Sequence, residues 1–175
     1  MSRGDAAPFI AGEMLHVDGG QVSATESPIE LRPVGEGDFA AWLPLWEGYQ
    51  RFYRIEIAEE VTRRTWERFL SPAEPMYALL AMMGNQALGL AHTVHHRSTW
   101  TTKDHCYLQD LFVAGEARGQ SVGRALVERV YADAARRGAA RVYWVTHESN
   151  HDAIRLYDRV AHRLPLIHFR LEIVN

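Results

Sequence analysis

The feature that most constrains the fold is a glycine-bearing turn between an apolar segment and an amphipathic one. The apolar run Tyr107–Val113 is followed by RGQSVGRALVERV, residues Arg118–Val130. Apolar residues then recur at helical spacing over Val122–Arg137, and Gly138 follows as a helix-ending residue. The next segment, RVYWVT at 141–146, is apolar on both faces, as a buried parallel strand is. Strand, turn, helix and strand in this order form a right-handed crossover unit, which predicts a mixed α/β protein.

The rest of the chain supplies further elements of both kinds. Alternating apolar residues indicate strands, and apolar residues spaced by three and four indicate helices. A Gly84-Asn85 turn between two apolar runs predicts an antiparallel hairpin. The predicted strands are 29–34, 76–83, 86–96, 105–113, 141–146 and a closing strand at Leu164–Val174; the predicted helices are 39–54, 59–70, 122–137 and one that begins at Asn150.

Size and composition restrict the class of protein. A chain of 175 residues that is 47% hydrophobic can bury one substantial core. The net charge of −3 gives no electrostatic case for nucleic acid or an anionic membrane as a partner. The single cysteine, Cys106, excludes an internal disulfide and fits a reducing compartment. We find no signal peptide and no apolar run near the roughly 18 residues of a spanning helix. The expected location is therefore the cytoplasm.

Residues 1–28 differ in character from residues 29–175. Their one apolar segment, FIAGEMLHVDGG, is similar to the C-terminal stretch of short-chain dehydrogenases. The other motifs of that family, a Gly-rich nucleotide turn and a Tyr-x-x-x-Lys pair, are missing, which makes NAD binding the weakest functional hypothesis. We interpret residues 1–28 as an appended tail without a function of its own, and residues 29–175 as the functional domain.

The glycine turn has the chemistry of an anion site. The first turn of a helix exposes unpaired N–H groups and a partial positive charge. Gly119 and Gly123 let the backbone bend and a ligand approach, Ser121 adds a hydroxyl, and Arg118 adds a charge. The turn predicts a diphosphate cradle, with a ligand-free turn as the alternative. It is not a Walker loop, because the Gly-Lys-Ser/Thr ending is absent.

A second motif lies in SNHDAIRLYDRV. Asn150, Ala153 and Tyr157 are spaced i, i+3 and i+7, so they lie along one stripe of a helix. The stripe places a tyrosine on the same side as the asparagine that opens the helix. A core tyrosine on an amphipathic helix is the alternative interpretation.

Together the two motifs resemble a known superfamily. YLQDLFVAGEARGQSVGRAL, followed about 25 residues later by N-x-x-A-x-x-L-Y, is similar to the GCN5-related N-acetyltransferases (GNAT), and the resemblance spans Ile29–Val174. The most similar branch is related to yeast enzymes that acetylate histones, polyamines or D-amino acids, and to spermidine/spermine acetyltransferases. The resemblance implies a mostly antiparallel twisted sheet with a central parallel strand pair and helices on both faces. It also implies acetyl-CoA as co-substrate, no metal, and a homodimer formed through the C-terminal strands.

The resemblance also assigns roles to residues. Backbone near Phe112 and Val113 would pair with the pantetheine arm, and Asn150 would hydrogen-bond that arm. Tyr157 would stand near the thioester sulfur and donate to the leaving thiolate. Ser121 replaces a glycine that is common in the family, and a positive φ there would cost about 1 kcal/mol. The pyrophosphate would be held by the amides of Arg118, Gly119, Gln120, Ser121, Val122, Gly123 and Arg124.

The reaction also needs a proton acceptor. An alkylammonium has a pKa near about 10.4, so it must lose a proton before its nitrogen can attack. In the spermidine-type relatives the position of Gln109 is a glutamate, and glutamine cannot take a proton. The remaining candidates are Asp110, Glu148, a histidine or a water chain, and we assign the role to Asp110. Strand alternation separates Gln109 from Asp110 unless a bulge intervenes, so a structural role for Asp110 is the alternative.

The predicted function is therefore acetyl-CoA-dependent transfer of an acetyl group to a primary amine of a small molecule, such as a polyamine, an amino acid or an aminoglycoside-like compound. Acetylation of a protein lysine or N-terminus, and a non-catalytic acyl-CoA sensor, are the alternatives. The nine histidines match no metal-site spacing. Cys106 as an acyl-carrying nucleophile lacks a basic neighbour other than His105. The aromatic residues of the first two helices, including Phe52 and Tyr53, are interpreted chiefly as core.

Overall fold

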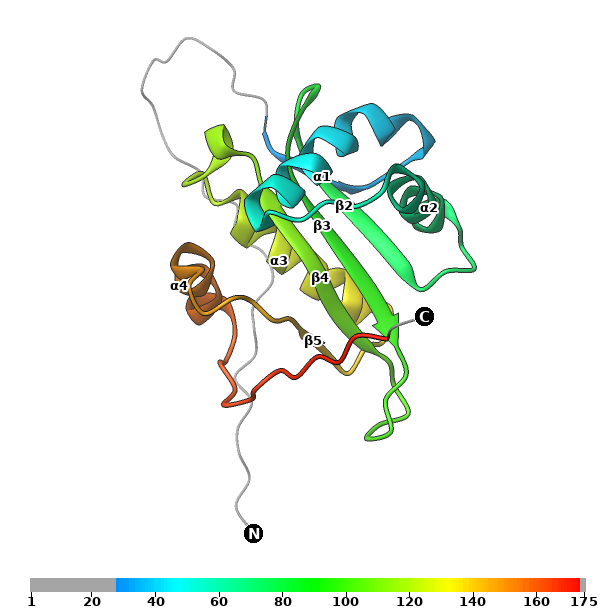
Figure 1. Ribbon diagram of the computed structural model, residues 1–175, viewed down its shortest axis with the longest axis vertical. Helices are drawn as coiled ribbons and strands as arrows, with labels where there is room; N and C mark the ends of the chain where they lie inside the picture. Colours follow the sequence, from blue (N-terminus) through cyan, green and yellow to red (C-terminus); the bar gives the residue numbers. More distant parts are fainter. Residues whose placement is uncertain (1–27, 174–175) are drawn as a thin grey trace.

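The computed structural model describes residues 28–173, which form one five-stranded sheet with helices on both faces (Figure 1). The strands are β1 (Glu30–Pro33), β2 (Met76–Met83), β3 (Gln86–His96), β4 (His105–Val113) and β5 (Arg141–Tyr143). They lie in sequence order across the sheet, antiparallel from β1 to β4 and parallel between β4 and β5. This arrangement confirms the predicted mixed, mostly antiparallel fold.

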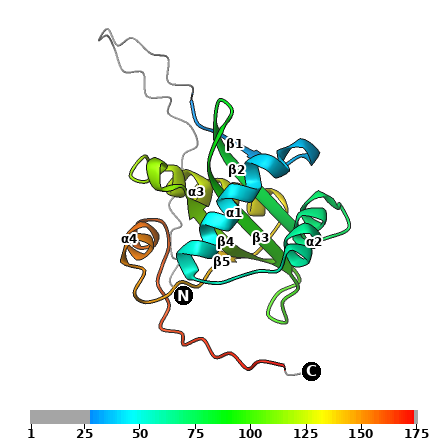
Figure 2. The same ribbon diagram turned by 45° about the horizontal axis from the view of Figure 1, so that its top comes forward.

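The helices divide the core into two layers. Helices α1 (Phe39–Tyr53) and α2 (Glu59–Leu70) bury Trp42 and Phe69 against one face of the sheet. Helix α3 (Val122–Arg136) buries Leu126 and Val130 against the other face. Helix α4 (His151–Val160) stands beside the end of α1, away from α2 (Figure 2). Short 3-10 turns at Glu36–Asp38 and Gly115–Ala117 precede α1 and α3.

A β-bulge in β4 changes the face that its side chains meet. The β3 partners of Leu108 and Asp110 are adjacent residues, so Gln109 is the extra, unpaired residue of the bulge. Beyond it the alternation continues in the opposite phase. Leu108 packs in the α3 layer, whereas Asp110 faces the α1 layer together with Phe112. The bulge therefore places a carboxylate on the α1 side of the sheet, where strict alternation from Leu108 would not put it.

The prediction of a closing strand at Leu164–Val174 is wrong for the residues described. Residues 164–173 form no strand, and their side chains are exposed; Val174 lies outside the described part. In addition, β5 ends at Tyr143 rather than at Thr146, and it is an outer strand, so the parallel pair β4–β5 lies at one edge of the described sheet rather than at its centre. Alternation identifies a segment that can pair, but pairing needs a free strand edge within reach. Within this chain the C-terminal segment does not take up the edge of β5.

Two sequence predictions concern the chain as a whole. The interpretation of residues 1–28 as an appended tail falls almost entirely outside the described residues, which begin at residue 28. Among the helices of the described part, none has both the length and the apolar character needed to cross a membrane.

Candidate active site

Within residues 28–173, one edge of β4 has no partner strand beyond Tyr107. Strand β5 pairs with β4 only over His105–Tyr107, after which the two strands separate. The N–H of Ala114 donates to the carbonyl of Leu88 on the β3 side at 2.9 Å. Because successive backbone groups alternate in direction, the N–H and carbonyl of Val113 face the free edge. The carbonyl of Val113 there accepts from Arg118 Nε at 3.4 Å. An extended ligand can pair with this edge as an added strand does.

A cavity of about 510 Å³ opens along this edge, between β4, the N-terminus of α3 and α4. It brings together nearly all of the residues predicted to bind the cofactor. Gln120 is the exception: it does not line the cavity, and its side chain is exposed and donates to the Glu116 carbonyl at 3.0 Å. The predicted residues that line the cavity are Phe112, Val113, Arg118, Gly119, Ser121, Val122, Gly123, Arg124, Asn150 and Tyr157.

The turn before α3 depends on two residues in the left-handed region. Gly119 has a φ of 80° and Ser121 a φ of 63°. Glycine adopts this conformation freely, whereas a side chain at Ser121 pays a steric penalty. Gly123 serves close packing, because a Cβ there would lie 3.2 Å from Leu156 Cδ2 of α4. The positive φ considered from the sequence is therefore present at Ser121.

Replacing Ser121 by glycine is expected to stabilise the protein by about 0.5–1 kcal/mol, the steric relief less the entropy that glycine loses. For a domain of this size that raises Tm by roughly 1–4 °C, which thermal unfolding followed by circular dichroism would detect. Ser121→Ala is the matched control. The serine side chain makes no capping hydrogen bond, so alanine loses nothing but keeps the Cβ. An equal gain with alanine would contradict the backbone explanation.

Positive charge surrounds the mouth of the cavity. The arginines that line it are Arg118, Arg124, Arg155 and Arg159, and Asp152 is the acidic residue among its lining. Arg155 forms an ion pair with Asp152, and Arg124 Nε lies 2.7 Å from Glu128 Oε1. Free amides at the start of α3 add to this field. The combination of a free strand edge, a helix N-terminus and arginines fits the adenosine-phosphate and pantetheine parts of coenzyme A.

Asn150 is fixed at the start of α4. Its Oδ1 accepts from the Ala153 N–H at 3.4 Å, which caps the helix, and its Nδ2 donates to Thr146 Oγ1 at 3.4 Å. Tyr53 of α1 meets the same group: partial burial raises the pKa of Tyr53, whereas contacts of its hydroxyl with Asn150 and Thr146 lower it. Asn150 thus joins the end of α1 to the start of α4 at the cavity wall.

Tyr157 presents a hydroxyl that stays protonated at neutral pH. Its ring packs against Trp144 at a centroid distance of 5.2 Å. Burial, and to a lesser extent the nearby Tyr53, raises the pKa of Tyr157 to about 12. A phenol that keeps its proton at neutral pH has an O–H group available to donate a hydrogen bond or a proton. This is the behaviour required of a group that protonates a leaving thiolate.

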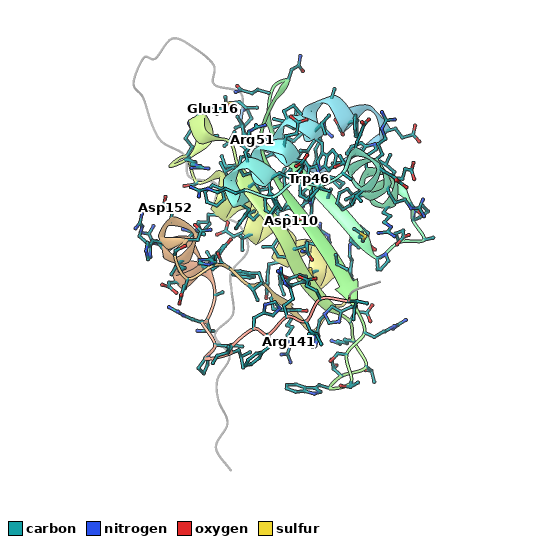
Figure 3. All side chains as sticks on the ribbon, viewed as in Figure 1. Trp46, Arg51, Asp110, Glu116, Arg141 and Asp152 are labelled. Carbon is teal, nitrogen blue, oxygen red and sulfur yellow. The ribbon has the colours of Figure 1, made fainter. Side chains whose placement is uncertain are left out.

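Asp110 lies near the middle of the sheet, close to where α1 crosses it (Figure 3). Its Oδ2 is 3.0 Å from His92 Nδ1. Burial raises the pKa of Tyr49, with further contributions from the charge of Asp110 and a hydrogen bond to it. Burial likewise raises the pKa of Tyr107, and the charges of Tyr143 and Asp110 add to the effect. Asp110 is therefore a buried carboxylate surrounded by tyrosine hydroxyls.

The comparisons with known proteins agree with this geometry. The model of the Acetyltransferase (GNAT) family matches residues 42–162. The chain belongs to the GNAT acetyltransferase family. It is also 36% identical over 137 residues to D-amino-acid N-acetyltransferase HPA3 of Saccharomyces cerevisiae, an alignment that covers 77% of this chain and 85% of that protein. The family and the yeast relative together identify this protein as an N-acetyltransferase.

Solved structures share the fold. A probable acetyltransferase superimposes with a TM-score of 0.73 at 23% identity, covering 83% of this chain and 99% of that one. An aminoglycoside acetyltransferase, meta-AAC0020 from an uncultured soil metagenomic sample, superimposes with a TM-score of 0.72 at 15% identity, covering 83% and 97%. At these identities the likeness concerns the fold alone, and it confirms the acetyltransferase architecture.

Sequence reasoning missed part of the acetyltransferase cavity. Phe52 and Tyr53, interpreted as core, are 48% and 38% exposed and line the cavity at the last turn of α1. Arg118 stacks over the Phe52 ring at 5.6 Å. Leu111, Ala117, Asp152, Ala153, Arg155, Leu156 and Arg159 complete the lining. The available signal was the position of two aromatic residues in the last turn of a helix whose buried residues come earlier.

The structure also bears on the alternative groups. Cys106 is completely buried in the α3 layer, and burial raises the pKa of its thiol to about 11. It is therefore a core thiol and not an exposed thiolate nucleophile. Glu148 is exposed in the loop before α4. Over residues 28–173, no three histidine, cysteine or acidic side chains come together as metal ligands could.

Proposed function

We propose that this acetyltransferase moves the acetyl group of acetyl-CoA to a primary amine of a small molecule. The observation that carries the proposal is the cavity in which the free edge of β4, the N-terminus of α3 and Tyr157 meet. Among small amines, an amino acid is the acceptor class that the comparison supports, because the yeast relative is named as a D-amino-acid N-acetyltransferase. Polyamines and aminoglycoside-like amines belong to the same proposal.

Each step of the transfer has a residue assigned to it. Asp110 takes a proton from the ammonium group, directly or through water, and leaves the lone pair on nitrogen. The acetyl thioester supplies the electrophilic carbon that the amine attacks. The outward N–H of Val113 stabilises the negative charge that develops on the carbonyl oxygen. Tyr157 donates a proton to the sulfur as the carbon–sulfur bond breaks. The second ammonium proton passes to solvent. Solvent also returns a proton to Tyr157 and takes up the one held by Asp110, so both groups are ready for the next turnover.

The donor and acceptor sides are linked through Tyr53. The charge of Asp110 contributes to the raised pKa of Tyr53, after burial, and Tyr53 in turn contributes to that of Tyr157. Tyr53 and Tyr157 also line the same cavity, and Asp110 lies on the side of the sheet that α1 covers. This supports an acceptor amine that approaches from the α1 side while the thioester lies along β4.

Thiol release from acetyl-CoA, measured with the purified chain, tests the proposal. The acceptor panel comprises spermidine, D- and L-amino acids, an aminoglycoside and a lysine-containing peptide. Release that depends on a small amine is the expected result. Release with the peptide alone would favour the protein-acetyltransferase alternative. Acetyl-CoA binding in calorimetry without turnover on any acceptor would favour the sensor.

We also infer that the chain forms a homodimer through its C-terminal segment. Leu164, Leu166, Ile167, Phe169, Leu171 and Ile173 are 62–89% exposed. From Ile167 to Ile173 the apolar residues alternate with His168, Arg170 and Glu172, as on an amphipathic strand. An exposed apolar face of this kind is typical of an interaction surface, and β5 offers an edge for it.

Phe169→Glu is expected to convert the dimer into a monomer, because it places a charge on the apolar face of the segment. Light scattering coupled to size-exclusion chromatography measures the mass. His168→Glu is the matched control, since it adds the same side chain on the polar face and should leave the dimer intact. A monomeric parent chain would refute the dimer. Equal dissociation of both variants would show that the apolar face carrying Phe169 is not the interface.

A further inference from the structure

A chain of three buried side chains lies behind Asp110. Trp42 Nε1 donates to His92 Nε2 at 2.8 Å, and His92 Nδ1 lies 3.0 Å from Asp110 Oδ2. Trp42, His92 and Asp110 are 0%, 2% and 8% exposed. The rings of Trp46 and Phe69 pack against the imidazole at centroid distances of 5.2 and 4.5 Å. The imidazole is therefore held in place on its two nitrogens and its faces.

The hydrogen bonds determine where His92 carries its proton. An indole N–H can only donate, so His92 Nε2 must accept and carries no proton. The proton of the neutral imidazole is then on Nδ1, which donates to Asp110. The other tautomer, and the imidazolium, would both point two N–H groups at each other across 2.8 Å. Trp42 thus selects one neutral tautomer of His92.

We propose that His92 is a positioning residue for acetyl transfer: with its tautomer fixed by Trp42, it holds Oδ2 of Asp110 through Nδ1 and so orients the carboxylate that takes the proton of the acceptor amine. The inference rests on the proposed role of Asp110 as proton acceptor. Tyr49 of α1 also hydrogen-bonds Asp110, and the charge of Asp110 contributes to the raised pKa values of Tyr53 from α1 and Tyr107 from β4.

This arrangement suits a base that must act while buried. The neutral imidazole donates a hydrogen bond that stabilises the Asp110 carboxylate. A neighbouring cation, by contrast, would neutralise the carboxylate charge and weaken it as a base. The imidazole cannot remove the proton that Asp110 gains, because its second nitrogen already accepts from Trp42. In the step itself the N–H bond of the ammonium breaks, an O–H bond forms on Asp110, and the electron pair remains on the amine nitrogen.

Nitrogen-15 NMR of histidine-labelled protein at neutral pH tests the tautomer directly. The His92 signals are identified by their loss in His92→Asn. We expect Nδ1 protonated and Nε2 unprotonated in the parent chain, and a mixture of tautomers in Trp42→Phe. Trp46→Phe is the matched control, because it lies on the same helix and in the same core, but donates to Thr62 at 3.3 Å. A proton on Nε2 in the parent chain, or equal changes in both variants, would overturn the proposal.

Kinetics test the consequence for the reaction. His92→Leu removes the donor to Asp110 and should lower kcat by roughly tenfold to 100-fold, the effect of one hydrogen bond to a charged group, with little change in the KM of acetyl-CoA. His92→Asn puts an amide N–H near the position of Nδ1 and should recover activity to within about threefold of the parent. His95→Asn, another buried histidine of β3, controls for packing.

The outcomes separate the two proposals. If no amine is acetylated by the parent chain, the proposed function fails, while NMR still decides the tautomer. If amines are acetylated and His92→Leu and His92→Asn lose activity equally, the role of the Nδ1 donor is refuted and the acetyltransferase function stands. Loss of activity in His95→Asn to the same extent as in His92→Leu would also refute it, since packing alone would then explain both.

Discussion

Replacing Tyr157 by phenylalanine is expected to lower kcat by about 100-fold while acetyl-CoA binding changes little. The phenol is the proton donor assigned to the leaving thiolate, and the ring alone keeps its packing against Trp144. Because burial raises the pKa of Tyr157 to about 12, the hydroxyl remains a donor throughout the neutral range. The activity of the parent chain should therefore show no loss from ionisation of this tyrosine until the pH approaches that value.

Steady-state thiol release and calorimetry on the same preparations measure the two quantities. Tyr131→Phe is the matched control, because Tyr131 lies on α3 and is 68% exposed, so its hydroxyl has no role in the cavity. A Tyr157→Phe variant with kcat within about threefold of the parent would show that the thiolate leaves without this donor.

Asp110→Asn is expected to lower kcat/KM for the acceptor amine by about 100-fold or more, because an amide cannot take the ammonium proton. The substitution nearly preserves shape, and Asp110 is not among the residues that line the coenzyme cavity, so acetyl-CoA affinity should be retained. Activity should partly return at high pH, where more of the amine is already neutral, since its pKa is near about 10.4.

Two further variants decide whether Asp110 is specifically the base. Gln109→Asn changes the exposed bulge residue beside it and should stay close to the parent. Glu148→Gln removes the exposed carboxylate that the sequence also offers. A greater loss from Glu148→Gln than from Asp110→Asn would transfer the role to Glu148, and Asp110 would then be structural.

Most of the cavity lining that the glycine turn and α4 supply could be predicted from local sequence. The glycines between β4 and α3 determine a turn that ends in free helix N–H groups. Backbone conformation and helix-end amides depend on only a few neighbouring residues, so this turn can be recognised in a short stretch of sequence. Asn150 and Tyr157 are seven residues apart, which is about two helical turns, so helix geometry alone places them on the same face. Ten of the residues assigned in this way line the cavity; Gln120 does not, and its side-chain amide donates to the carbonyl of Glu116.

The acceptor side could not be predicted in the same way. Whether Asp110 faced α1 or α3 depended on the bulge at Gln109, which is a property of pairing with β3 and leaves no clear mark in the composition of β4. Phe52 and Tyr53 looked like core residues, because an aromatic residue on a helix is usually buried, and only the position of α4 beside α1 made them cavity lining.

The sequence by itself determined the class of fold, the order of the elements and the glycine turn that opens α3, because each follows from periodicity and from backbone chemistry over short stretches. The tertiary structure alone decided which face Asp110 occupies, the hydrogen-bonded chain from Trp42 through His92, and the absence of a partner strand for residues 164–173. These features depend on contacts between segments far apart in the chain, and local periodicity carries no information about which distant edge or donor a residue will meet.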